Sequence, residues 1–225
     1  MKRLVIPLIF GVVGCAVLVS LGVWQLQRLA WKEGLLAEIE ARISDAPVDL
    51  PETLDVEQDR YLPVRVAGRT LGREIDVLVS TKEQGAGFRV ISTFETEVGR
   101  LIMVDEGYVR QTEKDAARPP VEMVVTGNVH WPDEVDGFTP EPDLGAEIWF
   151  ARDVPAMAAH LETEPVLVIA RTITGADARA TPLPVTTEGI PNSHLGYAVQ
   201  WFGLALVWAG MTAFFVWRMQ RRRQA

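Results

Sequence analysis

The sequence predicts a membrane-anchored α+β protein in which two transmembrane helices bracket one mainly antiparallel β domain with a short helix. Two uncharged apolar runs, 4–24 and 195–217, lie near the ends of the 225-residue chain. At 1.5 Å per residue, each run is long enough to cross a bilayer core about 30 Å thick. Between them the hydrophobic pattern changes to a period of two, which is typical of half-buried strands.

These patterns divide the chain into seven segments. In chain order they are a cytoplasmic tail (1–3), a transmembrane helix (4–26), a polar helical extension and linker (27–59), an exported β-rich domain (60–180), a connector (181–194), a second transmembrane helix (195–217) and a basic cytoplasmic tail (218–225).

Charge is distributed unevenly along the chain. Lys2, Arg3 and four arginines after Trp217 flank the apolar runs, whereas all 30 acidic residues lie between these ends. Because positive flanks stay on the cytoplasmic side, both termini are expected inside and the acidic domain outside. An acidic exported domain disfavours nucleic acid as a partner. The partner expected for both helices is the lipid bilayer.

Cys15 is the single cysteine, so the chain can form no internal disulfide and carries no CxxCH haem-attachment motif. The residues up to Cys15 also resemble a bacterial lipoprotein signal, which is cut before its cysteine. The apolar run continues to Trp24, however, beyond the 7–15 residues of a signal h-region. We therefore favour a retained helix.

The middle of the chain contains six or seven strand candidates separated by turn residues. A short helix is expected from the N-cap candidate Asp153, through Pro155, to about Leu161. Many strands with little helix indicate an antiparallel sheet, arranged as a sandwich or a partly closed barrel. The strand candidates are 61–68, 74–80, 88–94, 100–109, 121–129, 147–151 and 165–172.

No motif of an enzyme is found. The sequence has no glycine-rich phosphate loop, no GxSxG and no HExxH. The three histidines, His130, His160 and His194, share no metal-type spacing. Asp105 and Glu106 are adjacent on a strand candidate, so they would point to opposite faces and not form an acid–base pair. We expect a protein that is not an enzyme.

The second apolar run begins with the most distinctive pattern of the chain. His194 can be either a polar residue at the headgroups or a ligand, and the aromatic residues below it either an interfacial belt or a binding surface. The glycines on the opposite face are expected to form a flat groove for another helix. At 100° per residue, one face carries His194, Tyr197, Ala198, Trp201, Ala205 and Trp208, and the other carries Gly196, Gly203 and Gly210.

The end of the first apolar run carries Trp24, Arg28 and Trp31 on one face, at i, i+4 and i+7. They can form an interfacial anchor, with indoles and guanidinium among the headgroups. They can also form an anion site, with a guanidinium between two indoles. The spacing alone favours the anchor.

These two motifs together resemble the Surfeit-locus family of cytochrome c oxidase assembly factors. The first family motif is similar to 22–28 followed by Trp31-Lys32, and the second to 191–205. The segment 61–64 with Gly68, and Trp149-Phe150 with Asp153, also resemble family positions. The chain looks like a divergent bacterial member.

Two positions depart from the family pattern. An arginine-glycine-tryptophan step of the family reads Glu106-Gly107-Tyr108 here, which replaces a cation by an anion. Ser193 stands where the family often has asparagine.

The resemblance implies a role in the maturation of oxidase subunit I, during insertion of haem a, at the bacterial inner membrane with a periplasmic domain. In bacterial members the second-helix histidine is implicated in haem a binding, and here that residue is His194. Tyr197 and Trp201, with Trp208, would shelter the macrocycle and its farnesyl tail. Arg28, beside Trp24, would pair with a propionate. Haem A synthase and other oxidase assembly factors are further expected partners.

Two other functions remain open. The protein could be a structural chaperone or stable accessory subunit of the oxidase that binds no haem, in which case the glycine face matters more than His194. A membrane-anchored periplasmic hydrolase or sensor is disfavoured because the sequence lacks a nucleophile–base arrangement.

Overall fold

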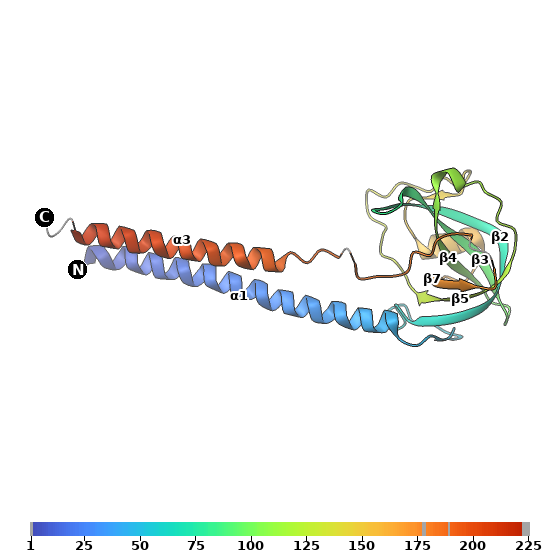
Figure 1. Cartoon of the computed structure of the whole chain (residues 1–225), viewed down its shortest axis with the longest axis horizontal. Coiled ribbons are helices and arrows are strands. Elements are labelled where there is room, and N and C mark those ends of the chain that lie inside the picture. The colour runs from blue at the N-terminus through green and yellow to red at the C-terminus, as the bar shows by residue number, and fades with distance from the viewer. Residues whose placement is uncertain (1, 177–178, 189, 222–225) are drawn as a thin grey trace. The chain divides into compact units, whose positions relative to one another are not determined.

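The computed structural model of the protein describes residues 2–176, 179–188 and 190–221 (Figure 1). Two long apolar helices lie at the two ends of the chain with a β-rich domain between them in sequence, as predicted. The chain forms two compact units. One contains the residues up to Glu38 together with those from Thr187, and the other contains Ile39–Thr186.

The helical unit contains most of α1 (Lys2–Ser44) and all of α3 (His194–Arg221). Both helices are long and apolar enough to cross a membrane. α1 continues without a break beyond its apolar run, so the apolar part and the polar extension form one helix. Its last residues, from Ile39, belong to the β unit.

Glycines on α1 form the contact between the two helices, which lie side by side (Figure 1). A Cβ added to Gly14 would lie 2.3 Å from Trp208 Nε1, and one added to Gly22 would lie 2.7 Å from Phe202 Cε1. The indole N–H of Trp208 donates to the carbonyl oxygen of Gly11 at 3.1 Å. Small residues on α1 thus let the aromatic side chains of α3 reach its backbone.

The glycine face of α3 is not the face that contacts α1. A Cβ added to Gly196, Gly203 or Gly210 would have no heavy atom within 4 Å. The opposite face makes the contact, with Ala198 and Ala205 only 1% and 7% exposed. A groove for another helix on the glycine face stays a prediction, because within this helix pair α1 supplies the small residues and α3 the large ones.

Besides the end of α1, the described residues of the β unit form seven strands, one 3₁₀ turn and one helix. They are β1 (Val48–Asp49), β2 (Pro63–Thr81), β3 (Gly85–Thr96), β4 (Leu101–Arg110), η1 (Gln111–Glu113), β5 (Glu122–Val129), β6 (Ile148–Trp149), α2 (Val154–Leu161) and β7 (Leu167–Thr174).

Five of these strands close a barrel. The order is β2–β3–β4–β7–β5, and β5 pairs again with β2. The pairs within this ring are antiparallel except β4–β7, which is parallel. Such a five-stranded Greek-key barrel is of the kind found in OB-folds, which is a statement about fold alone. The predicted barrel is therefore confirmed, with its ring of five strands joined by the pairing of β5 with β2, and the alternative of a sandwich is corrected.

A single long strand makes the closure possible. The first half of β2 pairs with β5 and its second half with β3, with a register irregularity between Thr70 and Glu74. Gly72 lies at φ +74° within this bend, a backbone conformation that favours glycine. The two strand candidates 61–68 and 74–80 are thus one bent strand.

Apolar side chains from all five barrel strands fill the interior, and α2 packs against them. Met157, Ala158 and Leu161 of this helix are at most 3% exposed. The predicted N-cap is confirmed, because Asp153 Oδ1 accepts a hydrogen bond from the Ala156 amide at 3.1 Å.

Replacing Gly14 by alanine should weaken the helix pair, because the added methyl group would lie 2.3 Å from the Trp208 indole nitrogen. Alanine is favoured over glycine inside a helix by about 1 kcal/mol, so any loss must come from packing. Gly203→Ala brings the same gain in helix propensity with open space around the methyl group. Thermal unfolding of the full chain in detergent micelles should show a lower midpoint for Gly14→Ala only. Equal midpoints for the two variants would contradict this packing.

Candidate functional site

The first residue of α3, His194, pairs with a glutamine of α1. His194 Nδ1 lies 2.8 Å from Gln25 Oε1. Gln25 is only 9% exposed, whereas His194 is partly buried. Because an amide oxygen only accepts, the Nδ1 atom carries the proton and donates it. In a neutral ring with this proton, Nε2 keeps its lone pair, through which a neutral imidazole can bind a metal.

A second contact holds the residues just before α3. The ammonium group of Lys32 donates to the carbonyl oxygen of Pro191. Lys32 lies two helical turns beyond Gln25, on the same face of α1. Together the two contacts fix the start of α3 against α1, so the position of the imidazole is determined by two polar contacts.

The three residues of the predicted aromatic–cationic face on α1 are all exposed. The guanidinium carbon of Arg28 lies 4.1 Å from the centre of the Trp31 ring, which is a cation–π contact. Among the described residues, Trp31 is the ring that Arg28 covers, so the guanidinium is not held between two indoles. Trp24 is 53% exposed. The geometry leaves the N–H donors of Arg28 available to an anion.

The aromatic residues of the predicted column on α3 differ in how far α1 covers them. Tyr197 is 50% exposed, Trp201 is partly buried, and Trp208 is engaged with α1 through Gly11. Trp208 is therefore a packing residue of the helix pair. The aromatic surface near His194 consists of Tyr197 and the accessible part of Trp201.

The other two histidines have structural contacts in the β unit. The ring of His130 stacks on that of Tyr61, with centroids 4.8 Å apart. His160 Nε2 lies 2.7 Å from Glu147 Oε2. Within the described part of the chain, no three His, Cys, Asp or Glu side chains are grouped so that they could hold a metal ion. The described residues therefore present single imidazoles and no cluster of ligands.

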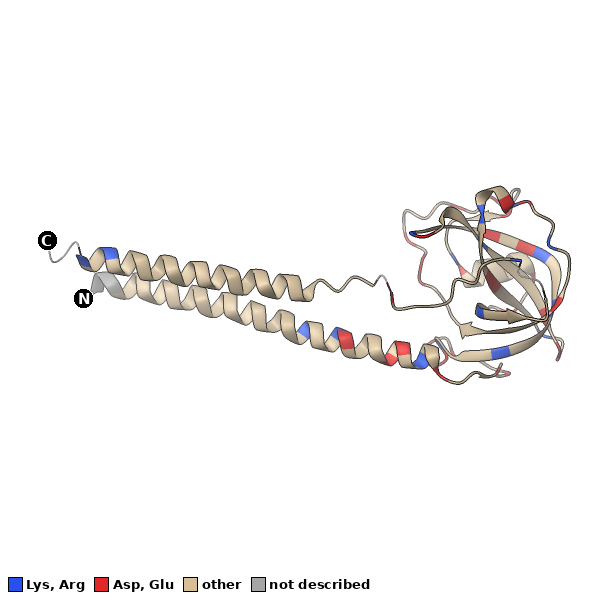
Figure 2. Ribbon diagram, in the orientation of Figure 1, with Lys and Arg blue, Asp and Glu red and all other residues tan. Residues whose placement is uncertain are grey.

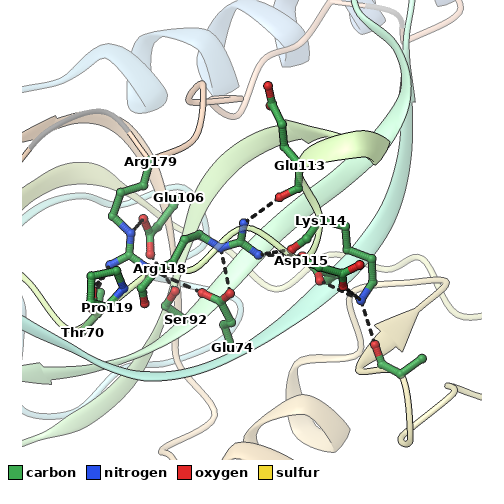
Figure 3. Close-up of polar contacts among 12 residues, drawn as sticks. Thr70, Glu74, Ser92, Glu106, Glu113, Lys114, Asp115, Arg118, Pro119 and Arg179 are labelled. Carbon is green, nitrogen blue, oxygen red and sulfur yellow. Dashed lines mark hydrogen bonds and ion pairs between the residues drawn. The ribbon is translucent and has the colours of Figure 1, made fainter.

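A second polar group lies inside the β unit around Glu106, as Figure 3 shows. Glu106 is fully buried, and its Oε1 accepts a hydrogen bond from Ser92 at 2.6 Å. Arg179 Nε lies 3.4 Å from Glu106 Oε2, and the same guanidinium donates to Thr70 Oγ1 and to the carbonyl oxygen of Pro119. The buried carboxylate of Glu106 is thus neutralised by an arginine from elsewhere in the chain.

Arg179 belongs to a segment, residues 179–183, that we call the strap because it lies along β4. Thr181 exchanges two backbone hydrogen bonds with Tyr108, of 2.9 and 2.7 Å. Gly107 has φ +114°, and a Cβ there would lie 2.1 Å from the Thr181 carbonyl oxygen. Only glycine allows this close approach.

The acidic neighbours of Glu106 are also paired with cations. Asp105 Oδ2 lies 2.7 Å from Arg89 Nη1, so Asp105 and Glu106 have separate partners. Glu74 Oε1 lies 2.7 Å from Arg118 Nε. Burial raises the pKa of Glu74. We interpret these pairs as structural, because each carboxylate is already engaged by an arginine.

Sequence reasoning identified His194, Arg28 and the aromatic residues, but it missed Gln25. The feature that could have identified Gln25 is a polar residue on the contact face of α1, one turn beyond Gly22. That signal becomes visible only when the face that meets α3 is known.

Comparison with known proteins places these features in a family. The family model described as SURF1 family matches residues 12–206. Surfeit locus protein 1 of Xenopus tropicalis is 31% identical over 211 residues, which cover 82% of this chain and 67% of the relative. The protein of the same name from Gallus gallus is 31% identical with the same coverage, and that from Homo sapiens is 30% identical, covering 83% and 69%. These relatives are eukaryotic and do not bear on the predicted bacterial origin.

Replacing Arg179 by alanine should destabilise the β unit by about 3 kcal/mol, because Glu106 would remain buried without its cation. Arg73→Ala is the matched control. It removes an exposed pair with Glu162 and should change the free energy of unfolding by less than about 1 kcal/mol. Urea unfolding of the full chain in micelles, followed by near-ultraviolet circular dichroism, measures both. Similar losses of unfolding free energy in Arg179→Ala and Arg73→Ala would refute the assigned role of Arg179.

His130 should make the β unit less stable in mild acid. Burial, with Arg152 and Arg60 nearby, lowers the pKa of His130 to about 4. Unfolded histidine titrates near 6.5, so between about pH 6.5 and 4 only the unfolded chain binds this proton, and stability falls as pH falls.

The expected loss over this pH window is about 2 kcal/mol. His130→Phe keeps a ring beside Tyr61 and removes the titration. The unfolding free energy of the parent minus that of the variant should therefore be larger at about pH 7 than at about pH 4.5. A parent–variant difference that does not change with pH would rule out this effect.

Proposed function

The chain belongs to the SURF1 family, and on that premise we propose that it is an assembly factor for cytochrome c oxidase that assists delivery of haem a to subunit I. The observation that carries this proposal is the contact of His194 Nδ1 with Gln25, which leaves Nε2 as the ring nitrogen able to bind iron. We propose no enzymatic step for the protein. Its further partners would be haem A synthase and other oxidase assembly factors, with no role for nucleic acid.

We place α3 and the apolar part of α1 across the bacterial inner membrane, with both termini in the cytoplasm and the β unit in the periplasm. The charge distribution supports this placement. Figure 2 shows long charge-free stretches in both helices, with cations at the end of α3. Arg218 and Arg221 lie in its last turn, and positive flanks favour the cytoplasmic side. His194 would then lie at the periplasmic surface.

The residues around His194 fit haem a as a cargo. One imidazole nitrogen would bind the iron. Tyr197, one turn along α3 and half exposed, and the accessible part of Trp201 would contact the macrocycle, with Trp24 as a further exposed aromatic surface. Arg28, supported by the Trp31 ring, would pair with a propionate by charge-assisted hydrogen bonds.

A single protein ligand also suits transfer. If the iron is held by one imidazole, release to an acceptor requires one coordinate bond to break. The surrounding contacts are of the aromatic and ion-pair kinds, which orient a cargo without closing around it. We therefore assign His194 as the ligand and the remaining residues as orienting contacts.

A second candidate function is a scaffold for oxidase subunits that binds no haem. The open glycine face of α3 favours it, because Gly196, Gly203 and Gly210 leave space for the close approach of another helix. In this case a partner helix, and not a pigment, would be the molecule recognised.

The optical spectrum of the full chain, purified from cells that make haem A, tests the proposal. We expect nearly stoichiometric haem a in the parent and its loss in His194→Ala. The matched control is His160→Ala, which removes a histidine paired with Glu147 and should keep the pigment. Arg28→Ala should lower haem occupancy without abolishing it.

Two results would overturn the proposal in different ways. A colourless parent that still co-purifies with subunit I would favour the scaffold. A pigmented His194→Ala would show that another residue holds the iron.

A further inference from the structure

Gln25 is a buried amide in a contact made otherwise by small and apolar residues. It lies on the α1 face that meets α3, between Gly22 and Leu29, and is only 9% exposed. A buried amide costs free energy unless its polar atoms form hydrogen bonds. Leucine, of similar volume, would avoid that cost. Packing therefore does not explain this residue, but its hydrogen bond to His194 does.

The contact determines which nitrogen of His194 carries the proton. The acceptor is the amide oxygen, 2.8 Å from Nδ1, so the proton must lie on Nδ1. In water, neutral histidine prefers to carry its proton on Nε2. The hydrogen bond thus reverses the intrinsic preference and also fixes the rotation of the ring.

We propose that Gln25 is the positioning residue of the haem site, because it keeps the proton of His194 on Nδ1 and presents Nε2 to the haem iron. This inference rests on the proposed function. Ligating histidines generally donate their other N–H to a fixed acceptor, and loss of that acceptor typically lowers metal affinity by about 10–100-fold. The amide oxygen of Gln25 supplies that acceptor here.

The arrangement also makes the site depend on helix pairing. Gln25 lies on α1 and His194 on α3, and the Lys32 contact to Pro191 adjoins them. The imidazole is in its iron-binding tautomer only while the two helices are packed at this level. Separation of the pair would release the Nδ1 proton from its acceptor.

The tautomer can be measured without haem. In the full chain labelled with ¹⁵N-histidine, in micelles at about pH 8, the parent should show His194 protonated on Nδ1. His194→Ala identifies the signal. Gln25→Leu should move the proton to Nε2, and the control Gln27→Leu, which alters an exposed glutamine on the same helix, should not.

Haem binding supplies the second readout, with ferric protoporphyrin as the probe. Gln25→Leu should weaken binding by about 10–100-fold, and Gln27→Leu should leave it unchanged. Gln25→Glu retains an acceptor. It should keep the affinity but lower the midpoint potential of the bound haem, because a stronger acceptor makes the imidazole more electron-rich and favours ferric iron.

The outcomes separate the two proposals. If His194→Ala binds the probe like the parent, the haem-ligand proposal fails. If His194→Ala loses binding but Gln25→Leu keeps the parental affinity and tautomer, only the role of Gln25 fails. An unchanged midpoint potential in Gln25→Glu would also overturn it, because a purely structural glutamine would not influence the iron.

Discussion

The packing of aromatic side chains on glycines is the contact on which the helical unit depends. α1 presents its backbone at Gly14 and Gly22, and α3 fills that space with Trp208 and Phe202. This contact decides which face of α3 is covered. With that face fixed, Tyr197 remains exposed and His194 comes to lie beside Gln25. The candidate site is therefore a product of helix pairing and not of either helix alone.

In the β unit, a buried ion pair is the contact that holds the strap to the barrel. Glu106 is fully buried, and its partner Arg179 lies outside the barrel strands, in the strap. Taking both charges out of water is costly, and the cost is offset only while the pair remains intact. The strap is thus held to β4 by an ion pair, and loss of either partner would leave the other charge buried and unpaired. Gly107 provides the space that this contact requires.

Local patterns predicted the elements well, whereas their pairing depended on information that one sequence does not contain. Alternating apolar residues located the strands, and Asp153 with Pro155 located the start of α2. Barrel closure was not predictable in the same way, because it depends on β2 bending between Thr70 and Glu74 and pairing with two strands.

The candidate site around His194 could also be predicted only in part from the sequence. Helical periodicity placed His194 and the aromatic residues on one face of α3, and the structure brings that face onto α1. The period of a helix gives relative directions but not which direction meets a neighbour. The glycines of α3 lie on the face away from α1, and Gln25 was missed because its importance lies in a partner 169 residues away.

The parallel pairing of β4 with β7 has a consequence for the order in which the chain folds. β7 lies between β4 and β5 in the barrel and ends at Thr174, and the strap begins at Arg179. Contacts between segments so distant in sequence form late, because the intervening chain must first lose its freedom. The barrel can close only when nearly the whole β unit has been synthesised, shortly before α3 emerges from the ribosome. Closure of the barrel is thus a late event in the folding of the β unit.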